Sequence, residues 1–458
     1  SEDYSISIRS DRVDGEDYLR FRTTDGLSDE IEFYFNYPVD TTISEGWKPD
    51  GTTGFQAEEA VINRIDAAEE QIDFCMYNNN REDIVRALKR AHNRGVQVRY
   101  ITDDETTNWA LGNTSLPFTV VDGNIGDGLM HNKFVVIDPD LAEKAWVITG
   151  AMNMTTGQIA TDYNHLVFIR EQSLALTYEQ EFEEMWGGEG SEPIPSESNF
   201  GEQKTSTTPV HHSLFGSGVE LYFAPTDRVS DQIRKTLAAG EHHIEFALLL
   251  LTQNEIGTTL IRSVEEGLEV RGIMENAIGP GSEFNRMRQG GVEVYEDIHS
   301  SAIFHHKYAI VDEGFSNPRL MTGSYNWSYS AESMHDENYI IFHHPDIVNV
   351  FAQDFEARYC EIVDCTTAID ETNSQYGVKV YPNPASKRVQ IKIPESMRGE
   401  PLTFKWYRSD GRLMQAKLST YITPSLSYDV STWPAGMYWL QIKSAEKNFS
   451  VPIYVEHP

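Results

Sequence analysis

The chain has 458 residues, 40 % of them hydrophobic, and a formal net charge of −34. Its length predicts two or three domains, its composition excludes a disordered chain, and no apolar run reaches the roughly 18 residues that a membrane-spanning helix needs. From Gln375 onward 11 basic residues outnumber 6 acidic ones, so the negative excess lies before that residue. We interpret the acidic part as solvated surface, unlike the basic footprint of a duplex-binding protein.

An internal repeat of strands and helices organises the chain before the C-terminal region. In each copy a strand is followed by an apolar pattern with helical spacing, a second strand, a second helix expected to end at Gly95 or Gly267, and a third strand. The paired strand segments are 32–35 and 220–223, 72–77 and 244–249, and 96–101 and 268–273. This alternation indicates α/β sheets with helices on their faces, and its duplication indicates two similar halves.

Changes in composition divide the chain further. A stretch rich in Gly, Pro, Ser and Glu separates the two copies, and a polar stretch follows the second copy. The expected segments are 1–186 for the first half with an N-terminal extension, 187–209 for the linker, 210–365 for the second half, 366–375 for a second linker and 376–458 for a C-terminal domain.

A His-x-Lys motif occurs once in each half, and each is followed by a Gly-x-x-Asn step. The motif and step residues are His131, Lys133 and Asn153 in the first half and His305, Lys307 and Asn326 in the second. One such motif alone would be weak evidence. Two copies at matching places in a duplicated fold are a specific signal for one composite site.

Strand geometry separates the side chains around these motifs. Because successive residues of a strand point to opposite faces, His131 and Lys133 share a face, and so does the equivalent pair of the second half. Asp138 and Asp312 lie an odd number of residues from the motif lysines. We therefore expect them to face away and to serve in a salt bridge or a turn. His306 alternates to the opposite face and is expected to be a packed or solvated neighbour.

The motif pattern, over residues 30–360, resembles the phospholipase D superfamily, often called the HKD family. The resemblance implies two α-β-α halves related by pseudo-twofold symmetry around one active site, with no metal and no cofactor. It also implies that one histidine attacks phosphorus and forms a phosphohistidine, while the other protonates the leaving oxygen. By family habit His131 is the expected nucleophile and His305 the acid, and the near symmetry of the halves leaves the reverse order open.

The resemblance also implies hydrogen-bonding and orienting groups. Asn153 and Asn326 would donate hydrogen bonds to the phosphate, and Ser324 would supply a hydroxyl that the first half, with Ala151, lacks. Glu337 matches the carboxylate that usually orients a histidine in this family.

The sequence offers two candidates for the orienting residue of the first half. Alignment on the Asp-x-Asn step places Tyr163 opposite Glu337, and the neighbouring Asp162 becomes the candidate after a small shift.

The three cysteines differ in their setting. Cys75 lies in an apolar strand segment and is expected to be a buried thiol. Cys360 and Cys365 are close in sequence and could form a small-loop disulfide in an oxidising compartment. Three cysteines do not make a metal site.

The C-terminal region consists of short alternating segments with turn residues between them, which predicts a small all-β sandwich domain. Its Tyr-Pro-Asn-Pro-Ala run at 381–385, its Asp-Gly pair at 410–411 and its Gly-Met-Tyr-Trp-Leu run at 436–440 resemble the sorting domain of the type IX secretion system. The resemblance implies recognition by that secretion machinery and export from a Bacteroidetes-type cell, to the medium or the cell surface.

Three functions are compatible with these features. The first is a phospholipase D-like hydrolase of phospholipids, which the acidic surface favours because polyanions would be repelled. The second is a secreted nuclease of the same superfamily, favoured by the run from Gly323 to Asn338, which looks most like the bacterial nuclease and cardiolipin hydrolase branch. The third, a non-catalytic cell-surface binding protein, is disfavoured because both motifs are intact.

Overall fold

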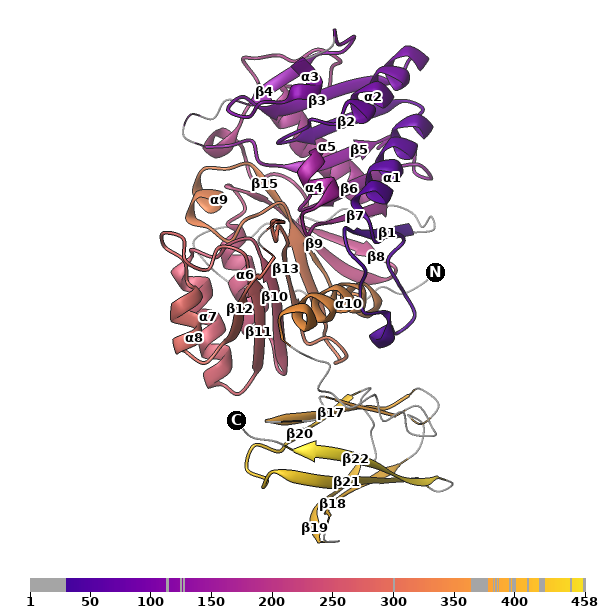
Figure 1. The fold of residues 1–458 in the computed structure, drawn as a ribbon. Helices are drawn as coiled ribbons and strands as arrows, with labels where there is room; N and C mark the ends of the chain where they lie inside the picture. The colour runs from indigo at the N-terminus through magenta and orange to yellow at the C-terminus, as the bar shows by residue number, and fades with distance from the viewer. Residues whose placement is uncertain are drawn as a thin grey trace.

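The structure is a computed structural model of the chain. It describes residues 30–112, 115–123, 126, 128–299, 301–363, 378–381, 383, 385, 387–394, 397, 401–409, 412–419, 425–444 and 447–455. Two lobes of sheet and helix pack against each other, and the C-terminal strands form a third, smaller lobe (Figure 1).

Seven strands form the sheet of the first half, in the order β1-β7-β6-β5-β2-β3-β4. The three strands β2, β3 and β4 run parallel, and the other neighbours are antiparallel. The strand bounds are β1 Glu30–Phe35, β2 Gln71–Met76, β3 Gln97–Asp103, β4 Val120–Gly123, β5 Lys133–Ile137, β6 Trp146–Gly150 and β7 His165–Arg170.

Helices cover both faces of this sheet. Helices α1 (Gly54–Ala67) and α2 (Glu82–Arg94) bury their apolar residues on one face, and α5 (Gln172–Trp186) packs on the other. The predicted end of α2 at Gly95 is confirmed, because this residue has a φ of 99°, a left-handed conformation that favours glycine.

The second half repeats this plan with one extra edge strand. Its sheet has the order β12-β11-β10-β13-β14-β15-β9-β8, and all of this order but β8 corresponds to the first sheet read from β4 to β1. The strand bounds are β8 His211–Leu214, β9 Ser217–Ala224, β10 His243–Leu248, β11 Glu269–Met274, β12 Glu293–Glu296, β13 Lys307–Val311, β14 Arg319–Gly323 and β15 Glu337–Phe342. The predicted duplication of an α/β unit is therefore confirmed.

The helices of the second half also lie on two faces. Helices α6 (Val229–Ala238), α7 (Asn254–Glu265) and α8 (Phe284–Gln289) cover one face, and α10 (Pro345–Ile362) covers the other. The short helices lie in connections: η1 Thr41–Ile43, α3 Trp109–Gly112, α4 Thr156–Ala160, η2 Gly201–Gln203 and α9 Tyr329–Ser333.

The two halves share one hydrophobic core. Residues of α5 and α10 belong to the same buried cluster, together with the inward faces of both sheets. Phe351 on α10 contacts Phe35 of β1 with ring centroids 5.2 Å apart, and Tyr178 on α5 contacts Phe223 of β9 at 5.4 Å. Burial of large aromatic side chains between the halves favours their close docking. The two halves thus direct ends of their strands toward the junction between them.

The C-terminal lobe has its own core and consists of two antiparallel sheets, β16-β17-β20 and β19-β18-β21-β22. The strand bounds are β16 Lys379–Tyr381, β17 Arg388–Lys392, β18 Leu402–Arg408, β19 Leu413–Ser419, β20 Ser425–Asp429, β21 Gly436–Lys443 and β22 Asn448–Val455. In β18, Leu402, Phe404 and Trp406 alternate inward, as the predicted β-sandwich requires. Across the described parts of the whole chain, no helix has the length and apolar character needed to cross a membrane.

Candidate active site

The two His-x-Lys motifs occupy equivalent ends of the two sheets. Strand β5 begins at Lys133 and β13 begins at Lys307, so each motif histidine stands just before a central strand. Lys133 pairs with Met76 at the carboxyl end of β2, and Lys307 pairs with Leu248 at the carboxyl end of β10. Loops beyond the ends of central strands are common places for functional groups.

Backbone contacts between the halves bring both motifs to one site. The His131 amide donates to the Asp336 carbonyl over 3.0 Å, and the His305 amide donates to the Tyr163 carbonyl over 2.9 Å. Each motif is thus held by the segment that precedes the last strand of the other half. The two motifs are therefore parts of a single site at the junction of the halves.

Each histidine is oriented by a side chain from the opposite half. His131 Nδ1 lies 2.7 Å from Glu337 Oε1, and His305 Nδ1 lies 3.2 Å from Asn164 Oδ1. Both histidines are buried, with 7 % of each exposed. The two imidazoles are chemically different, because one faces a carboxylate and the other faces a neutral amide.

The expectation that Asp162 orients a histidine is wrong. Asp162 Oδ1 accepts a hydrogen bond from the Ile303 amide over 3.1 Å and thereby fixes the loop before the second motif. Strand pairing explains the error: Gly150 lies opposite Leu166, whereas Gly323 lies opposite Tyr339, so Asn164 and not Asp162 corresponds to Glu337. Counting back from the strand, instead of aligning on the Asp-x-Asn step, would have identified Asn164.

The motif lysines lie against the histidines of their own motifs. Lys133 Nζ is 3.1 Å from His131 Nε2 and donates to the His131 carbonyl over 2.8 Å. Lys307 Nζ is 3.2 Å from His305 Nδ1 and 3.4 Å from its Nε2. Both lysines are almost completely buried. The side-chain pairing predicted from strand alternation is confirmed.

Burial dominates the electrostatics of this site. It lowers the pKa of Lys133 to about 7 and the pKa of Lys307 well below its usual value. It also lowers the pKa of both His131 and His305, and the charges of both lysines lower the two values further. Because each lysine acts on both histidines, the four groups lie within one electrostatic environment.

Glu337 is the only carboxylate in contact with a motif histidine among the described residues, and burial raises its pKa to about 7. The site therefore holds more groups that can carry positive charge than groups that can carry negative charge. A buried excess of cations is costly unless an anion compensates it. The arrangement thus fits an anionic ligand such as a phosphodiester.

The asparagines and the serine expected at the site have different settings. The side-chain oxygens of Asn153 and Asn326 are buried and have no hydrogen-bond partner within the part of the chain that the structure describes. These oxygens can accept a hydrogen bond but cannot donate one, so a phosphate would be contacted through the amide nitrogens of the two side chains. Ser324 Oγ instead accepts hydrogen bonds from the amide and the side chain of Asn338, at 3.0 and 3.2 Å. It therefore holds the start of β15 in place.

Two rings beside His131 were not found by sequence reasoning. Tyr77 lies 4.7 Å and His335 lies 6.0 Å from the His131 ring, measured between ring centroids. Tyr77 follows the end of β2, and its ring also lies 5.1 Å from Lys133 Nζ. Its place directly after a central strand is a signal that could have drawn attention to it.

The aspartates of the two motifs have structural roles, as strand parity predicts. Asp138 accepts hydrogen bonds from the amides of Glu69, Glu70 and Gln71, and Asp312 accepts three equivalent bonds before β10. Both adopt a positive φ, 48° and 55°. Each carboxylate caps the loop that enters a central strand and is remote from the histidine end of the motif.

His306 and the cysteines also have defined settings. His306 is packed between the halves, with its Nδ1 3.0 Å from that of His165. Cys75 is a buried free thiol, and Cys360 is disulfide-bonded. Cys365, its expected partner, lies outside the described residues. In the described part of the chain, no group of three or more His, Cys, Asp or Glu side chains is arranged to hold a metal ion.

Two family models match separate parts of the chain. A family model described as cardiolipin synthase, PLD-like domain, matches residues 61–186 and again 233–359, which together make up more than half of the chain. A second model, described as a secretion system C-terminal sorting domain, matches residues 379–456. The predicted resemblances to a duplicated PLD-like unit and to a type IX sorting domain are confirmed.

Individual relatives cover shorter stretches. A mitochondrial cardiolipin hydrolase from Xenopus tropicalis is 28 % identical over 122 residues, which are 26 % of this chain and 56 % of that protein. A phospholipase D from Rickettsia conorii is 33 % identical over 135 residues, 29 % of this chain and 62 % of that protein. The chain therefore matches less than two thirds of the length of these relatives.

A solved structure shares the fold of both halves. The crystal structure of a phosphatidylserine synthase from Haemophilus influenzae has a TM-score of 0.52 and 13 % sequence identity, and the match covers 72 % of this chain and 86 % of that one. At this identity the likeness concerns the fold alone.

Proposed function

The chain belongs to the PLD-like domain family, and we propose that it is an exported, metal-independent phosphodiesterase that hydrolyses phospholipids through a phosphohistidine intermediate. The observation that carries the proposal is the buried pair of His-x-Lys motifs, in which the two histidines have unlike partners. Export is a consequence of the sorting domain at residues 379–456.

The partners assign a role to each histidine. With Glu337 accepting the Nδ1 proton of His131, the lone pair of His131 lies on Nε2, the atom that faces Lys133. The carboxylate also stabilises the positive charge that the ring gains on attacking phosphorus. His305 faces a neutral amide, so its protonated form is a stronger acid and suits protonation of a leaving oxygen.

The reaction follows in two displacements. His131 Nε2 attacks phosphorus, a P–N bond forms, the P–O bond to the leaving alcohol breaks, and His305 gives its proton to that oxygen. Water then attacks phosphorus, neutral His305 takes a proton from the water, and the P–N bond breaks to restore His131. Lys133 and Lys307 offset the charge on the equatorial oxygens, and the amides of Asn153 and Asn326 hydrogen-bond to them.

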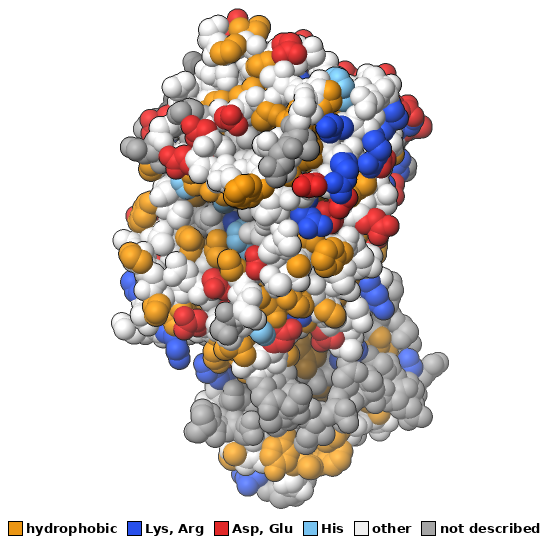
Figure 2. Space-filling view, turned by 45° about the horizontal axis from the view of Figure 1, so that its top comes forward, with side chains coloured by type: hydrophobic (Ala, Val, Ile, Leu, Met, Phe, Trp, Pro, Cys, Tyr) orange, Lys and Arg blue, Asp and Glu red, His pale blue; other side chains and the backbone are white. Residues whose placement is uncertain are grey.

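The surface near the site supports a lipid substrate. Trp109, Ile278, Ile298 and Ile303 are between 45 % and 84 % exposed. Trp109 begins the short helix α3 after β3, and the three isoleucines lie in loops that follow β11 and β12 or precede β13, at the sheet ends where the motifs stand. Figure 2 shows hydrophobic side chains near histidine side chains on one face of the molecule, with acidic side chains among them. Apolar side chains around a phosphodiester site suit an aggregated lipid.

A nuclease is the second candidate. The run from Gly323 to Asn338 resembles the nuclease and cardiolipin hydrolase branch, and the same chemistry would cleave a nucleic-acid phosphodiester. The net charge of −34 disfavours this reading, because a polyanionic substrate would be repelled. A non-catalytic binding protein would not need two lysines buried against two histidines.

The test is a direct comparison of substrates. Head-group release from phospholipid vesicles and cleavage of plasmid DNA are measured with the same protein, both in the presence of a chelator. We expect chelator-resistant head-group release that His131→Ala abolishes. Plasmid cleavage with no lipid turnover would favour the nuclease, and full activity in His131→Ala would exclude the proposed mechanism.

A further inference from the structure

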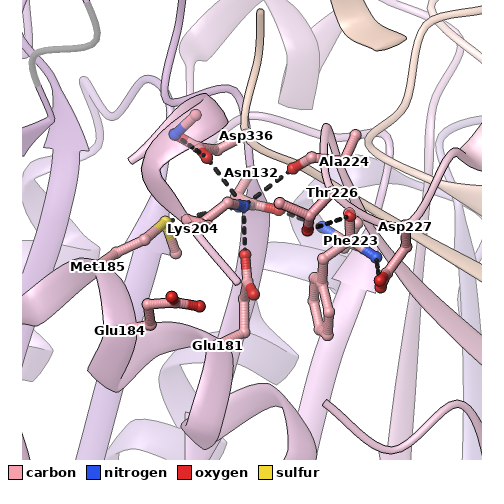
Figure 3. Close-up of polar contacts among 12 residues, drawn as sticks. Asn132, Glu181, Glu184, Met185, Lys204, Phe223, Ala224, Thr226, Asp227 and Asp336 are labelled. Carbon is pink, nitrogen blue, oxygen red and sulfur yellow. Dashed lines mark hydrogen bonds and ion pairs between the residues drawn. The ribbon is translucent and has the colours of Figure 1, made fainter. Parts of the chain in front are cut away.

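Lys204 lies at the junction of the halves and belongs to neither motif. It directly follows η2, in the connection between the two halves, and its side chain is completely buried. Figure 3 shows the contacts of this side chain. Its Nζ donates to Glu181 Oε1 at 2.5 Å, to Asp336 Oδ1 at 2.8 Å and to the Ala224 carbonyl at 2.9 Å. All three ammonium hydrogens therefore have an acceptor. One linker residue thus ties α5 of the first half to two segments of the second.

A short chain of contacts leads from Lys204 to the proposed nucleophile. Asp336, which Lys204 holds by its side chain, accepts the His131 amide hydrogen on its carbonyl and donates its own amide to the Leu129 carbonyl. The next residue is Glu337, whose carboxylate orients the His131 ring. The position of Asp336 therefore fixes both the backbone and the imidazole of His131.

The contacts of Lys204 with Glu181 and Asp336 are ion pairs between buried groups. Burial opposes protonation of Lys204, but the charges of Asp336 and Glu181 outweigh it and raise the pKa of Lys204 above its usual value. Burial raises the pKa of Glu181 to about 7 and also raises the pKa of Asp336. The Lys204 cation stays in place at neutral pH and compensates carboxylates that would otherwise be buried without a partner charge.

Among the described residues, the other motif has no lysine–carboxylate contact of this kind. The residue that corresponds to Asp336 in the first half is Tyr163, which also accepts a histidine amide but carries no carboxylate. Tyr163 instead has the Arg358 guanidinium over its ring at 5.1 Å. In the described part of the chain, the lysine–carboxylate support therefore lies on the side of the site that carries the proposed nucleophile.

We infer that Lys204 is a positioning residue that holds the Asp336–Glu337 segment in register with His131 when the two halves are docked. The inference rests on the proposed phosphohistidine mechanism. The linker between the halves would then position His131 as well as connect the two halves.

Three variants of the full chain test this role. Lys204→Met removes the cation. Asp336→Ala removes the side-chain contact between Lys204 and the segment that holds His131, and it keeps the backbone carbonyl that accepts the His131 amide hydrogen. It leaves Lys204 and Glu181 as a neutral pair, so this variant is expected to fold. Glu181→Gln keeps an oxygen acceptor for Lys204 and leaves the Lys204–Asp336 contact intact. Lys235→Met, at an exposed position on α6, is the matched control.

Two readouts separate positioning from stability. We expect Lys204→Met and Asp336→Ala to lower kcat about 10- to 100-fold with KM within about twofold, because a shift of about 1 Å at a nucleophile has effects of this size. We expect Glu181→Gln to lower the unfolding midpoint and to keep kcat within about threefold of wild type, since it leaves the proposed path intact. The low-field imidazole N–H resonance of His131, assigned by its loss in His131→Gln, should broaden or shift in the first two variants only.

Several results would overturn the inference. The inference is overturned if the Lys204→Met variant folds and has a wild-type kcat and an unchanged His131 resonance. It is also overturned if Glu181→Gln loses as much kcat as Lys204→Met. Should Lys204→Met not fold, Asp336→Ala decides by the same criteria. Absence of turnover in the wild-type protein would contradict the proposed function instead, and the resonance alone would then decide the role of Lys204.

Discussion

His131 Nδ1 and Glu337 Oε1 lie 2.7 Å apart although 206 residues separate them in the sequence. Glu337 belongs to the second half and His131 to the first, so the pair exists only when the halves are docked. The other histidine, His305, has the neutral amide of Asn164 as its partner at 3.2 Å. This difference distinguishes two motifs that are nearly the same in sequence.

Separate removal of the two histidines should have different consequences. His131→Ala should abolish turnover and phosphoenzyme formation, because no nucleophile remains. His305→Ala should lower kcat about 10²- to 10⁴-fold for an alkyl leaving group and much less for a p-nitrophenyl leaving group, which needs no proton. Quenched-flow detection of acid-labile phosphoenzyme checks both, with His211→Ala, at an exposed position, as the control. A phosphoenzyme in His131→Ala but not in His305→Ala would reverse the assignment.

Asn164→Asp should make the two histidines more alike. A carboxylate beside His305 Nδ1 would stabilise its protonated form and raise its pKa from the lowered value. We expect the imidazole titration of His305 to move to higher pH in a histidine-labelled NMR spectrum. Asn164→Gln, which adds length without charge, serves as the comparison. An unchanged His305 titration in Asn164→Asp would contradict the role of the amide.

Binding of sulfate, a dianion that does not itself titrate near neutral pH, should take up protons there. Burial holds the pKa of Lys133 at about 7, so a substantial fraction of this lysine is neutral at pH 7.5. A bound anion raises this pKa, so the lysine gains a proton and protons are taken up from solution on binding. Calorimetry in buffers of different ionisation enthalpy measures it, and Lys133→Met should reduce it. Proton release on binding would contradict the electrostatics described above.

The pKa of Lys133 also predicts how kcat/KM changes with pH on the alkaline side. In the enzyme without substrate, kcat/KM should fall as the pH rises through about 7, since the neutral form of Lys133 can no longer stabilise phosphate. A Lys133→Arg variant, whose guanidinium stays charged, should lose this alkaline limb even if its activity is lower. A limb that persists unchanged in Lys133→Arg would exclude Lys133 as its origin.

Asp138→Ala should destabilise the fold and spare the chemistry. Loss of the three amide hydrogen bonds to this buried carboxylate is expected to cost about 3 kcal/mol. Calorimetric unfolding should show a lower midpoint, while kcat of the folded protein stays within about twofold. Asp140→Ala, at an exposed position in the same turn, is the control. A large fall in kcat at unchanged stability would mean that the motif aspartate takes part in catalysis.

The exposed apolar side chains near the site predict a surface effect. Trp109→Ser combined with Ile278→Ser should weaken binding to zwitterionic vesicles and lower hydrolysis of vesicle lipid several-fold, by loss of buried apolar area. Hydrolysis of a monomeric short-chain phosphodiester should not change. Trp439→Ser, in the C-terminal lobe, is the matched control. Equal losses on vesicles and on the monomeric substrate would mean that these residues act on catalysis and not on docking.

Much of the site could be predicted because its residues repeat. Duplication identified both His-x-Lys motifs, and the period of two along a strand placed His131 beside Lys133 and turned Asp138 away. Those predictions concern neighbours in one strand, where backbone geometry alone decides the direction of a side chain. The error at Asp162 had a different origin, because the register of β7 against β6 depends on pairing between strands that the Asp-x-Asn step does not reveal.

The amino-acid sequence by itself determined the duplicated α/β plan, the β-rich sorting domain and the chemical identity of the groups that meet a phosphate. Docking of the halves decided which carboxylate faces which histidine, placed Asn164 against His305, and buried Lys204 against Asp336. The physical reason is range: periodicity and turn chemistry act over a few residues, whereas these contacts join positions well over a hundred residues apart. They form only when the shared aromatic core between α5 and α10 is closed.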